Sequence, residues 1–280
     1  MTPRDRSTHD RPNRERPARN PADLRRANRE KRERSPEIDE DVTGRELDKD
    51  AARQLGTLND TNRTWVAKHL VMAGRLIDID PQLAFEHALA ASRRGGRLAL
   101  VREAVGLAAY AAGDYAEALR ELRTYRRISG DQTHLAVMAD CLRGLGKPEK
   151  ALELAAEPEA QQISGSARAE LAMVTAGAHQ DLGDHASALA ALEIPELNLQ
   201  RAYSFSPRLY SMYAECLIQL GRESEAQRWQ AQIPVAEKAL GTGSYAEPEI
   251  MDFDDDEEPV ALPKVKDLVD DSGAHQTRRD

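Results

Sequence analysis

The chain has 280 residues, of which 40% are apolar, 4% aromatic and 31% charged, with a mean hydropathy of −0.64 and a formal net charge of −9. This composition excludes a single core that spans the whole chain, and no run approaches the roughly 18–20 apolar residues that crossing a bilayer needs. Two cysteines can build neither a disulfide framework nor a structural zinc site. We therefore expect a cytoplasmic protein with no membrane segment, metal or cofactor.

Charge divides the chain into three parts of different physical character. Residues 1–34 hold 12 Arg and Lys against 6 Asp and Glu, whereas residues 246–280 hold 4 against 12. These two segments therefore carry +6 and −8, and the remainder of the chain carries −7. Such blocks indicate a basic head, a mildly acidic body and an acidic tail.

The head, residues 1–44, is rich in Arg and Pro and is predicted to be disordered. Up to Ser35 its only large apolar residue after Met1 is Leu24, so little apolar surface is available to offset the entropy of ordering. Clustered arginines release counterions from phosphate, which favours an RNA- or ribosome-associated factor as the alternative function. Against it, six acids interleave with the bases and no Phe, Tyr or Trp is present to stack on a base.

The body, residues 45–240, has apolar residues at helical spacing, broken by turn signals. In its clearest unit, residues 98–129, a first helix carries Gly106, Gly113-Asp114 forms the turn, and a second helix holds Ala118. The frame recurs three times downstream and once upstream, where Asp80-Pro81 replaces the turn glycine. The matching second-helix alanines, spaced by 34, 33, 37 and 38 residues, are Ala84, Ala118, Ala151, Ala188 and Ala226. This period predicts an all-α stack of helical hairpins.

The unit built on Gly106, Gly113-Asp114-Tyr115 and Ala118 resembles the tetratricopeptide repeat, and the resemblance covers roughly residues 64–233. Two departures are that Leu122 replaces the usual second-helix aromatic and that each unit lacks its closing proline. The resemblance implies a TPR-like α-solenoid of about five hairpins, whose concave groove is lined by first helices and holds a peptide or a partner's helix. The whole layout is also similar to that of a group of actinobacterial repeat proteins with no assigned function.

Projecting the repeat register gives the residues expected to face the groove. The candidate binding residues are Glu103, Tyr110, Asp140, Arg143, Gln180, Asp181, Arg208 and Glu215. Further groove positions are His69, Leu107, Met173, Ser211 and Gln219. The face is mixed in sign and mildly acidic, so a ligand with basic and apolar side chains fits it. The Lys, Asn and Arg clamp with which some family members hold a terminal carboxylate is absent, since its places hold His69, Ala73, Glu103 and Ala136.

The last unit concentrates aromatic residues, of which Tyr203 and Phe205 are the best candidates for exposure because they lie in a loop. The others are expected to pack beneath a terminal helix at Pro234–Leu240. Cys141 and Cys216 are interpreted as small buried apolar side chains.

The tail, residues 241–280, is predicted to be disordered, and its acidic run lacks the glycine and ligand spacing of a calcium loop. It could attract the head or occupy the chain's own groove.

No catalytic pattern is present: the chain has no H-E-x-x-H, P-loop or G-x-S-x-G sequence. The sequence therefore predicts a non-enzymatic protein–protein interaction module that binds a protein or peptide partner. A regulatory appendage of a separate enzyme is a further alternative.

Overall fold

A computed structural model describes residues 35–243; the predicted disorder of residues 1–34 and of most of the tail lies outside the described residues. Within residues 35–243 the chain forms eleven α-helices and two 3₁₀ turns without any strand, which confirms the all-α class. None of these helices is long and apolar enough to span a membrane.

Ten of the helices form five consecutive pairs, and the two helices of each pair pack against each other. The pairs are α3 (Asp60–Leu76) with α4 (Pro81–Gly95), α5 (Ala99–Ala111) with α6 (Tyr115–Ser129), α7 (Leu135–Gly144) with α8 (Pro148–Ala155), α9 (Gly165–Asp181) with α10 (His185–Leu192), and α11 (Ser206–Gln219) with α12 (Glu223–Leu240). A short helix, α2 (Lys49–Gln54), and a 3₁₀ turn, η1 (Leu55–Thr57), precede them. A second turn, η2 (Ala160–Gln162), joins α8 to α9.

The turns within these pairs have the chemistry that the sequence predicts. Left-handed glycines stand in four of them, at Gly113, Gly146, Gly183 and Gly221. Asp114 then caps α6 by accepting from the backbone N–H of Glu117 at 3.0 Å. Upstream, Asp80 caps α4 in the same way and Pro81 occupies its first turn. The glycine turns reverse the chain, and an aspartate at the N-cap of α4, α6 and α10 satisfies a backbone donor at the start of each of these three helices.

Small residues let the two helices of a pair approach closely. The five second-helix alanines are all at most 1% exposed. In α5, a Cβ placed on Gly106 would lie 2.7 Å from Cδ2 of Leu122, closer than real contacts allow. One apolar cluster extends from α5 to α9, so neighbouring hairpins share a core rather than burying their faces separately.

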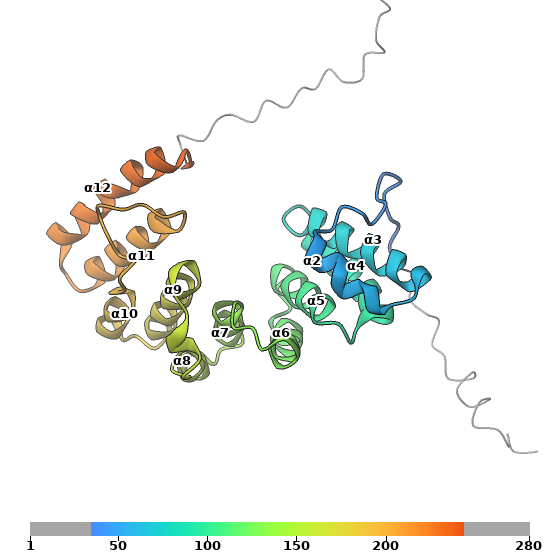
Figure 1. Ribbon diagram of the computed structural model, residues 1–280. Helices are drawn as coiled ribbons and strands as arrows, with labels where there is room; N and C mark the ends of the chain where they lie inside the picture. The colour runs from blue at the N-terminus through green and yellow to red at the C-terminus, as the bar shows by residue number, and fades with distance from the viewer. Residues whose placement is uncertain (1–34, 244–280) are drawn as a thin grey trace, which may run out of the picture.

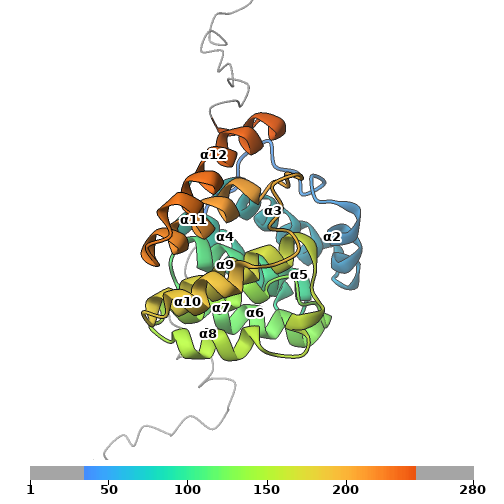
Figure 2. The same ribbon diagram turned by 90° about the vertical axis from the view of Figure 1, so that its left-hand side faces the viewer.

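The hairpins follow a curved path, with α3–α5 in one arm of the arc and α9–α12 in the other (Figure 1). The first helices α5, α7 and α9 lie on the inside of the arc, and α6, α8 and α10 on the outside (Figure 1). Figure 2 shows the same path from the side of α10 and α12. First helices of neighbouring hairpins also touch, since α7 packs on α9 and α9 contacts α11.

The packed body begins earlier than residue 45, the boundary expected from the sequence. Val42 is fully buried and packs with Val71 and Met72 of α3, and Ile38 covers the same cluster. The Arg75 guanidinium donates to Asp41 at 2.7 Å. Residues 35–44 therefore belong to the body, because the apolar side chains of Ile38 and Val42 cover one side of α3.

The C-terminal hairpin also differs from expectation. Instead of a separate helix at Pro234–Leu240, α12 runs without a break from Glu223 and contains Pro234 within it. Phe205, expected to be exposed, is only 8% exposed and stacks on the half-buried Tyr203 ring at 5.2 Å. This loop closes the end of the core because its aromatic rings cover the apolar side chains beneath them.

Candidate functional site

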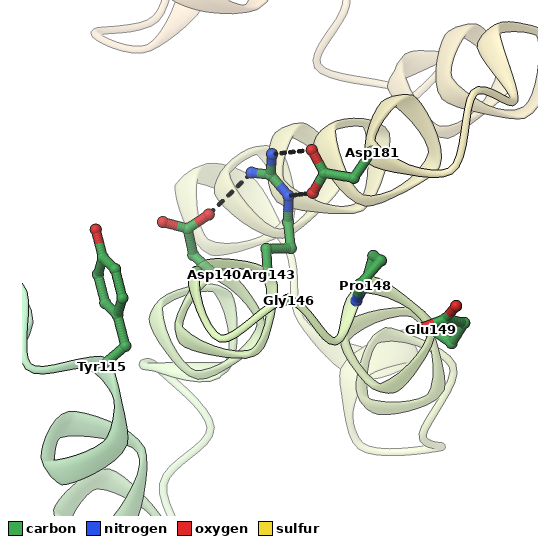
Figure 3. A pocket seen from close by; sticks show the side chains of 8 residues that line it. Tyr115, Asp140, Arg143, Gly146, Pro148, Glu149 and Asp181 are labelled. Carbon is green, nitrogen blue, oxygen red and sulfur yellow. Dashed lines mark hydrogen bonds and ion pairs between the residues drawn. The ribbon is translucent and has the colours of Figure 1, made fainter.

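The inside of the arc holds a hollow of about 610 Å³, which we call the inner groove. Four helices that are not consecutive in the chain, α5, α7, α9 and α11, provide its walls. Its apolar lining is Ala136, Val137, Ala167, Met173, Val174 and Met212, and its polar lining is Tyr110, Thr133, Asp140, Arg143, Ser166, Glu170 and Arg208. A second hollow of about 550 Å³ adjoins it at the α7–α8 turn and shares Asp140 and Arg143 (Figure 3).

Arg143 lies between two carboxylates at the junction of these hollows (Figure 3). Its Nε and Nη2 donate to the two carboxylate oxygens of Asp181 at 2.8 and 3.2 Å, and its Nη1 donates to Asp140 at 2.9 Å. The Tyr110 hydroxyl donates to the other oxygen of Asp140 at 2.7 Å. Hydrogen bonding to Asp181 raises the pKa of Arg143, while burial, together with the bond to Asp140, raises the pKa of Tyr110. One guanidinium and two carboxylates give the cluster a formal net charge of −1.

A glycine of α9 makes this position of Arg143 possible. A Cβ on Gly177 would lie 2.5 Å from Cζ of Arg143, so only glycine lets the guanidinium lie against the helix backbone. Because α7 supplies the arginine and α9 supplies both the flat surface and Asp181, the contact also fixes the spacing of two hairpins.

Further polar contacts connect neighbouring hairpins along the inner face. Glu103 of α5 bonds to His134, the N-cap of α7, at 2.6 Å. Arg208 of α11 pairs with Glu170 of α9, and the Gln180 amide donates to the Cys216 thiol at 3.3 Å. Each contact spans from 31 to 38 residues of sequence, so none could be found by searching for local patterns.

The structure brings together part of the groove set expected from the sequence. Tyr110, Asp140, Arg143 and Arg208 line the inner groove, and Asp181 lines the adjoining hollow. Three other candidates, Glu103, Gln180 and Glu215, stand on the same first helices but outside the lining of both hollows.

Sequence reasoning missed the second carboxylate of the groove, Glu170, and the apolar Met212. Glu170 lies three residues before Met173, a position already assigned to the groove, so the helical period could have found it.

His69, expected in the groove, is fully buried between α3 and α4. Its Nδ1 lies 2.9 Å from Nδ1 of His87, which is also fully buried, and the Nε2 atoms of both rings have no hydrogen-bond partner among the described residues. Burial lowers the pKa of His69 to about 4 and also lowers the pKa of His87. Since both rings are fully buried, this pair belongs to the core, and among residues 35–243 no three His, Cys, Asp or Glu side chains are grouped to hold a metal ion.

No protein-family model matches the chain, and no curated protein matches its sequence. Interpretation of the inner groove therefore depends on its own geometry and chemistry.

Proposed function

We propose that the chain is a non-catalytic, TPR-like interaction module of the cytoplasm that binds a peptide or partner helix in the inner groove. The observation that supports this most directly is a hollow with an apolar floor, walled by four helices from four different hairpins. Its volume lies within the range of small-molecule pockets in proteins, roughly 300–1,000 Å³, which is room enough for a few side chains. It can accept a few apolar side chains of a ligand, while the polar groups around it fix the ligand's orientation.

The apolar side chains of the groove, which we call its floor, and the charged side chains around them, which we call its rim, would have different roles in such a complex. Val137, Val174 and Met212 are partly exposed apolar side chains, so covering them removes apolar surface from water at about 25 cal/mol per Å². Charged groups of the rim contribute mainly to specificity and to the rate of encounter.

Binding of peptides from a displayed random library to the full chain tests the proposal. Val174→Glu puts a charge on the groove floor, and Ala116→Glu puts the same charge on the exposed outer surface of α6. Peptides selected on the unmodified chain should bind the groove variant at least about tenfold more weakly, a difference of about 1.4 kcal/mol, and the control variant unchanged. Equal binding to both variants, or the failure to select any peptide, would count against the groove.

A second pair of variants asks whether the position of Arg143 matters without removing its charge. Gly177→Ala forces the guanidinium away from α9, whereas Gly74→Ala places the same methyl group where nothing lies within 4 Å. Peptide affinity should fall in the first variant and stay constant in the second, with circular dichroism confirming that both are folded.

A further inference from the structure

The groove's charge indicates what kind of segment can occupy it. Four carboxylates line the two joined hollows, Asp140, Glu149, Glu170 and Asp181, against two arginines, Arg143 and Arg208, which gives a net charge of −2. Both arginines are already paired with carboxylates of the same face. An acidic segment such as residues 246–280, with its charge of −8, would be repelled, and a basic segment would be attracted.

The position of Arg143 shows that this surface can hold a guanidinium group. One guanidinium already lies between Asp140 and Asp181, and these two side chains keep 28% and 38% of their surface exposed. Each carboxylate has about four lone-pair sites, so oxygen sites remain open to a second donor. Next to them lies the apolar floor at Val137 and Val174. The best complement is therefore a large apolar residue followed directly by arginines.

We propose that the occupant is the basic head of this same chain, with Leu24 on the apolar floor and Arg25 and Arg26 at Asp140 and Asp181. Leu24 is the only large apolar residue between Met1 and Ser35, and two arginines follow it directly. Residues 1–34, the part of the head that precedes the described body, carry +6, opposite in sign to the groove. The inference rests on the proposed function of the inner groove and adds an intramolecular ligand that a partner must displace.

The length of the head is sufficient for this contact. Arg93 of α4 donates to the Ser35 hydroxyl at 2.9 Å, so the head leaves the body at α4. Leu24 lies eleven Cα–Cα steps before Ser35, and this segment spans up to about 36–40 Å when extended. The packed pairs α4–α5, α5–α6 and α6–α7 give three helix spacings of about 8–10 Å, so α7, with Val137 and Asp140, lies within about 30 Å along this path, and α9 packs directly on α7. The tether also gives the head an effective concentration on the order of millimolar, so weak ion pairs suffice to hold it.

Tryptic cleavage of the full chain after Arg25 and Arg26, followed site by site by mass spectrometry, tests the proposal. A synthetic peptide of residues 1–40 gives the cleavage rate of an undocked head. We expect slow cleavage in the full chain and cleavage about tenfold faster in the double variant Asp140→Asn/Asp181→Asn, which removes both acceptor charges. Leu24→Ser should have a similar effect, with circular dichroism checking that the body of this variant stays folded.

Matched controls separate the groove from general electrostatics. The double variant Glu86→Gln/Glu153→Gln removes two charges from exposed positions of α4 and α8 and should leave the cleavage rates unchanged. The rates should also be independent of protein concentration. Faster cleavage in the control, or faster cleavage after removal of residues 246–280, would overturn the proposal in favour of general attraction or of the tail as the head's partner.

Three further results would also overturn it. Cleavage of the full chain at the peptide's rate would show that the head is not docked. Equal protection of the unmodified chain and of the Asp140→Asn/Asp181→Asn variant would place the head elsewhere. Protection that increases with protein concentration would show docking on a second copy. None of these would affect the library-selected peptides and their sensitivity to Val174→Glu, so failure of this inference is distinguishable from failure of the proposed function.

Discussion

Mild acid is expected to destabilise the hairpin of α3 and α4, because two fully buried imidazoles face each other there. His69 and His87 share one hydrogen bond, and within residues 35–243 neither Nε2 atom has a hydrogen-bond partner. The charges acting on the pair are Arg93 and Arg94 of α4, which disfavour protonation of His69, and Asp39, which partly favours protonation of His87. Both rings are therefore held neutral in the folded chain.

The size of the effect follows from the shift of His69 alone. Its pKa is about 4 in the folded chain and 6.5 in the unfolded chain, so the unfolded state binds the proton first as the pH falls. Stability from this group is complete above pH 6.5 and is lost as the pH falls towards 4. Between pH 7 and pH 5 the loss amounts to about 2 kcal/mol, and His87 adds to it in the same direction.

Urea unfolding at pH 7, 6 and 5 measures this loss. The double variant His69→Phe/His87→Leu removes both titrating groups while keeping a ring against Trp65, whose centroid lies 4.5 Å from that of His69. Other ionisable groups titrate in both proteins, so the difference between them isolates the pair. The unmodified chain should lose about 2 kcal/mol more than the variant between pH 7 and 5. If both lose the same free energy, the argument from burial is wrong.

Two other predictions concern packing. Gly106→Ala should lower the free energy of unfolding by about 1–3 kcal/mol because its methyl group overlaps Leu122. Gly74→Ala adds the same methyl group where nothing lies within 4 Å and should raise the free energy of unfolding by about 0.5–1 kcal/mol. Urea titrations of the two variants measure both changes, and equal changes would refute the close approach of α5 and α6 at Gly106. Burial raises the pKa of Cys141 to about 12 and also raises the pKa of Cys216, so neither thiol should react with a disulfide reagent at pH 8 until urea unfolds the chain. Rapid labelling of the folded chain would contradict that burial.

The parts of the fold that could be predicted are those set by neighbours in the sequence. A left-handed glycine followed by a capping aspartate, as at Gly113-Asp114, is local chemistry, and it gave the correct turn. The spacing of the second-helix alanines gave the positions of closest approach for the same reason.

Contacts between hairpins could not be predicted, because they depend on how one helix pair is rotated on the next. Arg143 was assigned to the groove, yet nothing near it in the sequence indicates that it joins Asp181 across the surface of Gly177. His69 was misplaced because the projection treated the first hairpin like the others, whereas in the structure its ring points at His87 of α4.

The head's boundary was misplaced for a related reason. Two apolar residues, Ile38 and Val42, are too few to form a recognisable helical or strand pattern in the sequence. In the structure they nevertheless pack on the side of α3 that carries Val71 and Met72.

The polar contacts between first helices also have a mechanical consequence. Through the core of the arc, hairpins are joined by apolar packing, which added salt does not weaken. On the inner side, neighbouring hairpins are also joined by exposed ion pairs such as Arg208–Glu170 and Arg143–Asp181, which salt screens. The core contacts between hairpins therefore keep their strength as salt is added, whereas the contacts between first helices on the inner side weaken. Its radius of curvature, measurable by small-angle X-ray scattering, should increase as salt is added.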